Sequence, residues 1–138
     1  MKNILEEIAA RTRERIAKEK TCISVSELEN RIQEVNKNAG KRITFLQALQ
    51  KDGMSYICEV KKASPSKGLI APDFPYLAIA KEYEQAGASA ISCLTEPFYF
   101  QGADQYLREI AATVQIPVLR KDFTVDEYMI YQAKSLGA

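Results

Sequence analysis

Two charged residues stand inside a stretch that otherwise has the composition of a strand. Residues 56–62 read Tyr-Ile-Cys-Glu-Val-Lys-Lys and lead into a Ser/Pro/Gly turn signal. Because side chains alternate along a strand, Glu59 and Lys61 point to the same face as Ile57. A carboxylate and an ammonium on a buried parallel strand are costly unless they are paired, hydrated or used in chemistry. The alternative is a short edge strand whose two charges lie in solvent.

Polar and aromatic residues also follow a second strand-like segment, residues 89–95. The segment ends in Thr95 and Glu96, and the loop 98–102 reads Phe-Tyr-Phe-Gln-Gly. Ligands of parallel βα folds bind at the carboxyl ends of the strands and in the loops that follow them. This loop therefore belongs to the candidate site.

A third strand-like segment, residues 116–121, ends in the same way. Alternation places Lys121 and Phe123 on one face of the strand, and Arg120 and Asp122 on the other. Two inward lysines, a carboxylate and aromatic rings suit an anionic, partly aromatic substrate. The alternative is that Lys121 and Asp122 belong only to a polar loop after the strand.

The amino-acid composition limits the kinds of catalytic and metal site that this chain can contain. The sequence contains no histidine, so proton transfer has to come from Lys, Glu, Asp or Tyr, and a Ser–His or Cys–His nucleophile is excluded within this chain. The three cysteines are widely spaced without a C-x-x-C pair, which argues against a disulfide framework or a zinc site: Cys22, Cys58 and Cys93.

Net charge and hydropathy indicate which classes of partner and which cellular location are expected. The net charge of +1 favours neither nucleic acid nor an acidic membrane surface as a partner. No apolar run approaches the roughly 18 residues of a membrane span, and the N-terminus lacks a signal-peptide core. We therefore expect a cytoplasmic protein that acts on a small molecule.

The elements that would position these residues alternate between strand and helix. The three strand patterns start near residues 56, 89 and 116, at intervals of 33 and 27 residues. A helix pattern follows each strand, at 76–86, 103–113 and 125–136. This alternation predicts βαβ units and a parallel sheet.

Residues 1–54 have helical patterns only, and we expect them to form an N-terminal helical extension. Amphipathic patterns cover residues 1–20, a stretch from Ser24 to Asn38, and a short segment at 44–50. The first helix alternates basic and acidic residues, which predicts a solvated helix face: Arg11, Arg13, Arg15, Lys18 and Lys20 beside Glu6, Glu7, Glu14 and Glu19.

The last predicted helix stops at Gly137-Ala138, the same signal that precedes the second strand at Gly87-Ala88. Three βα units cannot close a barrel, and they leave two strand edges open. We therefore expect either a fragment of a longer chain or a chain that covers its edges with another copy of itself.

Three linked motifs resemble the indole-3-glycerol phosphate synthase family. They are Glu59-Val-Lys-Lys-Ala-Ser-Pro-Ser-Lys-Gly68, Leu94-Thr95-Glu96 with Tyr99-Phe-Gln-Gly102, and Pro117-Val-Leu-Arg-Lys-Asp-Phe123. The resemblance runs in order along the whole chain. It implies an α/β fold, a partial (β/α)8 TIM barrel of three βα units (55–138) preceded by the helical extension (1–54).

The resemblance also implies an activity and roles for single residues. The family is a carbon–carbon lyase (carboxy-lyase) of tryptophan biosynthesis, which closes 1-(2-carboxyphenylamino)-1-deoxyribulose 5-phosphate to indole-3-glycerol phosphate without cofactor or metal. By this resemblance Lys121 is the general acid, Lys61 binds the substrate carboxylate and assists proton transfer, and Glu59 holds and tunes the lysines. The substrate-binding residues implied in the same way are Ser64, Phe100 and Phe123.

Part of the family's site has no counterpart in these motifs. The second catalytic glutamate, an asparagine, an arginine and the phosphate site belong to later strands. We therefore expect little or no turnover from the 138-residue chain alone. The alternative function is an inactive half-barrel that self-associates, including by domain swapping. A third reading, the neighbouring isomerase of the pathway, is disfavoured by Glu59-x-Lys61 and by the lack of an early Cys/Asp pair.

Overall fold

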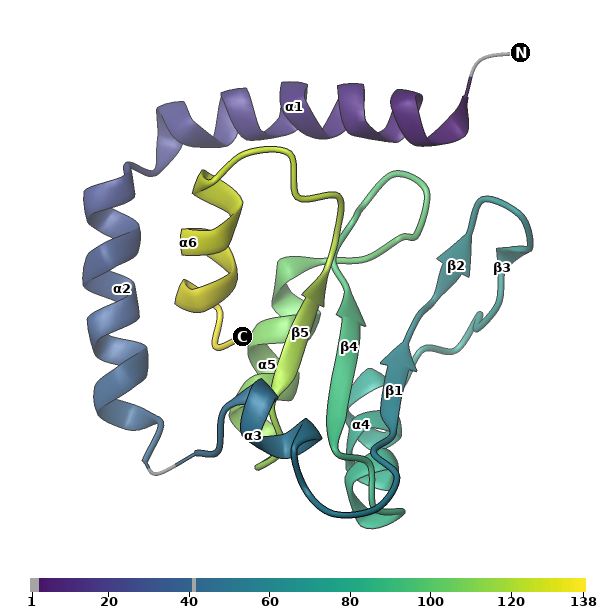
Figure 1. The fold of residues 1–138 in the computed structure, drawn as a ribbon. Helices are drawn as coiled ribbons and strands as arrows, with labels where there is room; N and C mark the ends of the chain where they lie inside the picture. The colour runs from purple at the N-terminus through teal and green to yellow at the C-terminus, as the bar shows by residue number, and fades with distance from the viewer. Residues whose placement is uncertain (1–2, 41) are drawn as a thin grey trace.

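A computed structural model describes residues 3–40 and 42–138 (Figure 1). Three parallel strands form one sheet in the order β1-β4-β5: β1 Ile57–Val60, β4 Ala90–Leu94 and β5 Val118–Lys121. Each strand is followed by a helix: α4 Tyr76–Gln85, α5 Asp104–Thr113 and α6 Tyr128–Ser135. The predicted α/β class and the parallel βα units are confirmed.

Side-chain alternation divides the sheet into two different faces. The register pairs Glu59 with Ser92 and Ser92 with Leu119, so these three residues share one face. The other face is apolar and packs against α4 and α5 in one core cluster that includes Val60, Ala80, Ile91, Cys93, Leu107, Ile110 and Val118. The helices therefore bury one face and leave the charged face to the candidate site.

Three further helices precede the sheet: α1 Ile4–Cys22, α2 Val25–Asn38 and α3 Phe45–Leu49. Figure 1 shows α1 crossing above the ends toward which β4 and β5 point, while α2 lies along α6. A second apolar cluster joins α1, α2 and α6 through Ile16, Leu28, Tyr128 and Met129. This cluster holds α1 over the carboxyl ends of the strands.

Local hydrogen bonds start these helices where the sequence predicted. The Ser24 hydroxyl accepts the Glu27 amide at 3.1 Å at the start of α2. Thr44 and Gln47 form a reciprocal capping box at the start of α3. No helix in the described ranges is both long and apolar enough to cross a membrane.

The segment after β1 differs from the predicted turn-rich loop. It contains two short antiparallel strands, β2 Ala63–Ser64 and β3 Gly68–Leu69. The Ile70 amide donates to the Lys62 carbonyl at 2.8 Å, and Gly68 takes a left-handed conformation at φ +63°. Strands of two residues are too short for apolar alternation to reveal them.

Candidate active site

Glu59 and Lys61 form an ion pair at the open face of β1. Lys61 Nζ lies 3.2 Å from Glu59 Oε1, and the Ser92 hydroxyl on β4 donates to Glu59 Oε2 at 3.0 Å. The side chain of Lys61 is 36% exposed and that of Glu59 is 33% exposed. β1 is an edge strand of the described sheet, as the alternative interpretation supposed, but its two charges pair with each other instead of pointing freely into solvent.

Lys61 shares an open pocket of about 550 Å³ with the β2–β3 hairpin and the loop after β4. The lining includes Ser64 and Phe100. The Ser64 side chain is buried, and its hydroxyl accepts the Lys67 amide at 3.2 Å. A cationic amine, a hydroxyl and an aromatic ring therefore border one cavity.

Phe123 and Lys121 complete the set of predicted site residues at the end of β5. The Phe123 and Phe100 rings lie 6.3 Å apart between centroids, tilted by 39°. Lys121 is exposed and stands opposite Leu94 in the register, so β4 separates it from β1. It lies on the Glu59 face of the sheet but does not line the pocket around Lys61.

A buried polar network lies at the carboxyl ends of β4 and β5, and the sequence analysis assigned it no role. The Asp122 carboxylate has no exposed surface and accepts hydrogen bonds from Arg15 at 2.9 and 3.0 Å and from the Thr95 hydroxyl at 2.7 Å. Arg120 donates to Thr95 at 3.0 Å and to Asp104 at 2.9 Å. The predicted placement of Arg120 and Asp122 away from Lys121 was the available signal for this network.

The predicted solvated face of α1 holds for most of its charged residues, which are exposed: Glu6, Glu7, Arg11, Arg13, Glu14, Lys18 and Lys20. Arg15 and Glu19 are half-buried instead. The Arg15 side chain is only 11% exposed because α1 crosses the strand ends, where Asp122 accepts its hydrogen bonds. Gln132 donates to Glu19 at 2.6 Å, and the Tyr99 hydroxyl donates to Glu7 at 2.6 Å. Glu7, Arg15 and Glu19 thus join α1 to residues that follow β4 and β5.

The pKa values of Asp126 and Cys93 are shifted by their surroundings. The hydrogen bond from Lys20, at 2.6 Å, lowers the pKa of Asp126 below its ordinary value of 3.8. Burial raises the pKa of the Cys93 thiol to about 12. Cys93 faces the apolar core on the helix side of β4, so this thiol is an inert packing residue and not a nucleophile.

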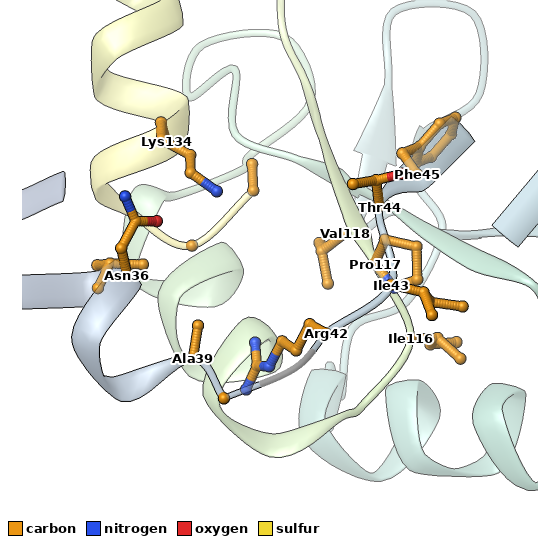
Figure 2. Close-up of a pocket in the computed structure, with 14 residues that line it drawn as sticks. Asn36, Ala39, Arg42, Ile43, Thr44, Phe45, Ile116, Pro117, Val118 and Lys134 are labelled. Atoms are coloured by element: carbon orange, nitrogen blue, oxygen red, sulfur yellow. The ribbon is translucent and has the colours of Figure 1, made fainter. Parts of the chain in front are cut away.

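A separate hollow of about 360 Å³ opens at the amino end of β5 (Figure 2). Four polar side chains line it: Asn36, Arg42, Thr44 and Lys134. Arg42 already donates to the Ala111 carbonyl at 2.7 Å. Because this hollow lies at the opposite end of the sheet from Lys121, it is not part of the candidate active site.

The described part of the chain contains neither a candidate metal site nor a disulfide. Within residues 3–40 and 42–138, no cluster of three or more His, Cys, Asp or Glu side chains could hold a metal ion. The three cysteines are free thiols. The arrangement can bind an anion through Lys61 and hold an aromatic ring against Phe100 and Phe123.

The chain is similar to known proteins of one family. A family model described as indole-3-glycerol phosphate synthase matches residues 5–138. A relative of that name from Ruminiclostridium cellulolyticum is 52% identical over 136 residues, which is 98% of this chain and 51% of the relative. A relative from Lacticaseibacillus paracasei is 52% identical over 135 residues, and one from Endomicrobium trichonymphae is 51% identical over 136 residues.

The chain spans about half the length of the curated relatives that it matches. The three βα units and the helical extension are therefore a partial (β/α)8 barrel, as the motifs predicted. The chain belongs to the indole-3-glycerol phosphate synthase family.

Proposed function

We propose that this chain supplies the first three strands of an active site that closes 1-(2-carboxyphenylamino)-1-deoxyribulose 5-phosphate to indole-3-glycerol phosphate in the cytoplasm. The observation that carries the proposal is the shared cavity of Lys61, Ser64 and Phe100, with Glu59 paired to Lys61 at 3.2 Å. Family membership supports the choice of reaction.

Lys61 is the proposed anchor for the substrate carboxylate. An ammonium binds a carboxylate through a charge-assisted hydrogen bond, and the cavity leaves this ammonium 36% exposed for that contact. Glu59 orients the lysine through the ion pair at 3.2 Å, while the Ser92 hydroxyl donates to the second oxygen of Glu59. Phe100 and Phe123 hold the faces and edges of the anthranilate ring.

Lys121 is the proposed general acid. The ring carbon that bears the carboxylate attacks the ribulose carbonyl carbon, and Lys121 gives its proton to the carbonyl oxygen as the new bond forms. Carbon dioxide then leaves, and its bonding electrons return to the ring. The hydroxyl takes a second proton and departs as water, while the methylene carbon next to the nitrogen loses a proton, so that the double bond of the indole forms. Its exposed position at the end of β5, on the Glu59 face, suits this role.

The remaining binding energy has to come from outside these three βα units. Phosphate groups in such barrels bind at the loops after strands seven and eight. We therefore propose that the 138-residue chain alone turns over little or no substrate and that the complete barrel is the enzyme.

A chimeric chain tests this proposal. Residues 1–138 would be joined to the second half of the Ruminiclostridium cellulolyticum relative, which is 52% identical over the matching first half. We expect the fused chain to form fluorescent indole-3-glycerol phosphate and the 138-residue chain to form none. A fused chain that folds cooperatively by circular dichroism but yields no product would contradict the proposed function.

A further inference from the structure

The loop between β4 and α5 is built around a buried carboxylate. Glu96 is 1% exposed, and its side chain accepts the backbone amides of Phe98 at 3.0 Å, Tyr99 at 2.7 Å and Phe100 at 3.0 Å. In the described ranges no lysine or arginine forms an ion pair with it. Buried carboxylates are costly unless hydrogen bonds satisfy them, so these three amides are what holds Glu96 in place.

The backbone of residues 96–102 is also fixed by a hydrogen bond and by close packing. The Gly102 amide donates to the Glu96 carbonyl at 2.8 Å, so the loop returns to the residue from which it starts. A Cβ at residue 102 would stand 2.4 Å from the Leu94 carbonyl oxygen, and Gln101 already has φ +49°. Phe100 projects from this fixed loop into the cavity that it shares with Lys61.

We propose that Glu96 is a positioning residue that sets affinity for the aromatic part of the substrate by fixing Phe100, without touching the substrate itself. This inference rests on the proposed function. A ring contact present in both the bound substrate and the transition state is uniform binding, so its loss raises KM and leaves kcat nearly unchanged.

The first test is Glu96→Gln in the chimeric chain. The amide has the same shape, but its NH2 group must face at least one backbone N–H, because both carboxylate oxygens accept hydrogen bonds. We expect KM to rise about tenfold, the size of one lost hydrogen bond to a charged group, with kcat within about threefold. The matched control is Glu82→Gln on the exposed side of α4, which should change neither constant.

A double variant separates positioning from general stability. If Glu96 acts through Phe100, adding Glu96→Gln to Phe100→Ala should raise KM no further than Phe100→Ala alone. A kcat that falls in proportion to the folded fraction, with KM unchanged, would overturn the proposal in favour of a stability role. If Glu96→Gln does not fold, Glu96→Asp keeps both acceptor oxygens but retracts them by one methylene, and the same rise in KM is expected.

Amide hydrogen exchange provides a readout that does not depend on activity. In the 138-residue chain, Glu96→Gln should speed exchange at residues 98–100 by about tenfold relative to helix α5. Unchanged exchange there would overturn the proposal even if the chimera is active. Faster exchange together with an inactive wild-type chimera would instead contradict the proposed function and leave the loop-fixing role intact.

Discussion

At the scale of single residues, the site depends on polar groups at three depths. Lys121 is exposed, the Glu59–Lys61 pair is about one-third exposed, and Asp122 and Glu96 are buried. The exposed groups are free to meet a substrate, whereas the buried ones accept hydrogen bonds that fix the backbone around them. Substitutions at these depths should therefore separate loss of chemistry from loss of fold.

Replacement of Lys121 by Ala in the chimeric chain should abolish turnover while sparing stability. The removal of a general acid costs on the order of 10²–10⁴-fold in rate, and an exposed side chain contributes little to packing. Steady-state kinetics and thermal unfolding would be measured on the same preparation. A near-normal kcat would remove Lys121 from the general-acid role.

Replacement of Asp122 by Ala should have the opposite signature. It leaves Arg15 and Arg120, which are 11% and 4% exposed, without a carboxylate that each approaches, at 2.9 Å and 3.7 Å respectively. The loss of one partner from a buried ion pair costs about 3–5 kcal/mol of unfolding free energy. Urea denaturation of the 138-residue chain measures this loss, and a change below about 1 kcal/mol would show that the network contributes little.

At the scale of elements, the sequence predicted the helices and the strands of the parallel sheet, but it did not predict the short β2–β3 hairpin. In the described ranges, the three strands of the parallel sheet and the six helices lie within a few residues of their predicted places. Each strand is a short, mostly apolar run next to turn signals, and each helix has an apolar stripe. The β2–β3 hairpin has neither. The partners of Arg15 and Glu19 on α1 could not be predicted, because the apolar stripe identifies the buried side, Ile8 and Ile16, but not what contacts the polar side.

In the candidate site too, side-chain alternation was predictable from the sequence, whereas hydrogen-bond partners were not. Alternation along β1 and β5 correctly grouped Glu59 with Lys61, and Lys121 apart from Asp122. The hydrogen bonds of Glu96 could not be predicted from the sequence, because its partners are backbone amides and no side-chain pattern indicates them. Charge patterns show where a polar group is, and only the fold shows which donors surround it.

The stability contributed by the ion pair between Lys20 on α1 and Asp126, just before α6, should depend on pH. Lys20 lowers the pKa of Asp126 below 3.8, so the Asp126 carboxylate contributes stability above pH 3.8 that is lost as the pH falls through its folded-state pKa. We expect the stability difference between the wild-type chain and Asp126→Asn to shrink as the pH falls below about 3.8. Urea midpoints at several pH values measure it, and a difference that grows on acidification would contradict this assignment.

At the scale of the whole molecule, the open face of the sheet carries apolar side chains beside the charged ones. Ile57 and Leu119 are 47% and 41% exposed on the face opposite α4 and α5. Apolar side chains at an open sheet favour contact with another chain. We propose self-association of the 138-residue chain through this face as its second candidate property.

Analytical ultracentrifugation checks this proposal directly. The wild-type chain should sediment as a dimer or larger species at micromolar concentration, and Ile57→Asp combined with Leu119→Asp should shift it toward monomer. Asp at two exposed positions of α4, Lys81 and Glu82, serves as the control and should leave the distribution unchanged. A wild-type chain that is monomeric throughout would contradict self-association.

The placement of α1 across the strand ends also fixes an order of events during synthesis. Its side-chain hydrogen bonds join Glu7 to Tyr99, Arg15 to Asp122, Lys20 to Asp126 and Glu19 to Gln132, over separations of 92, 107, 106 and 113 residues. Contacts across such separations form late, because the loop that they close must first be ordered. α1 leaves the ribosome before the strands that it covers, so the hydrogen bonds of Arg15 and Lys20 form only after β5 and the residues that lead into α6 have been synthesised.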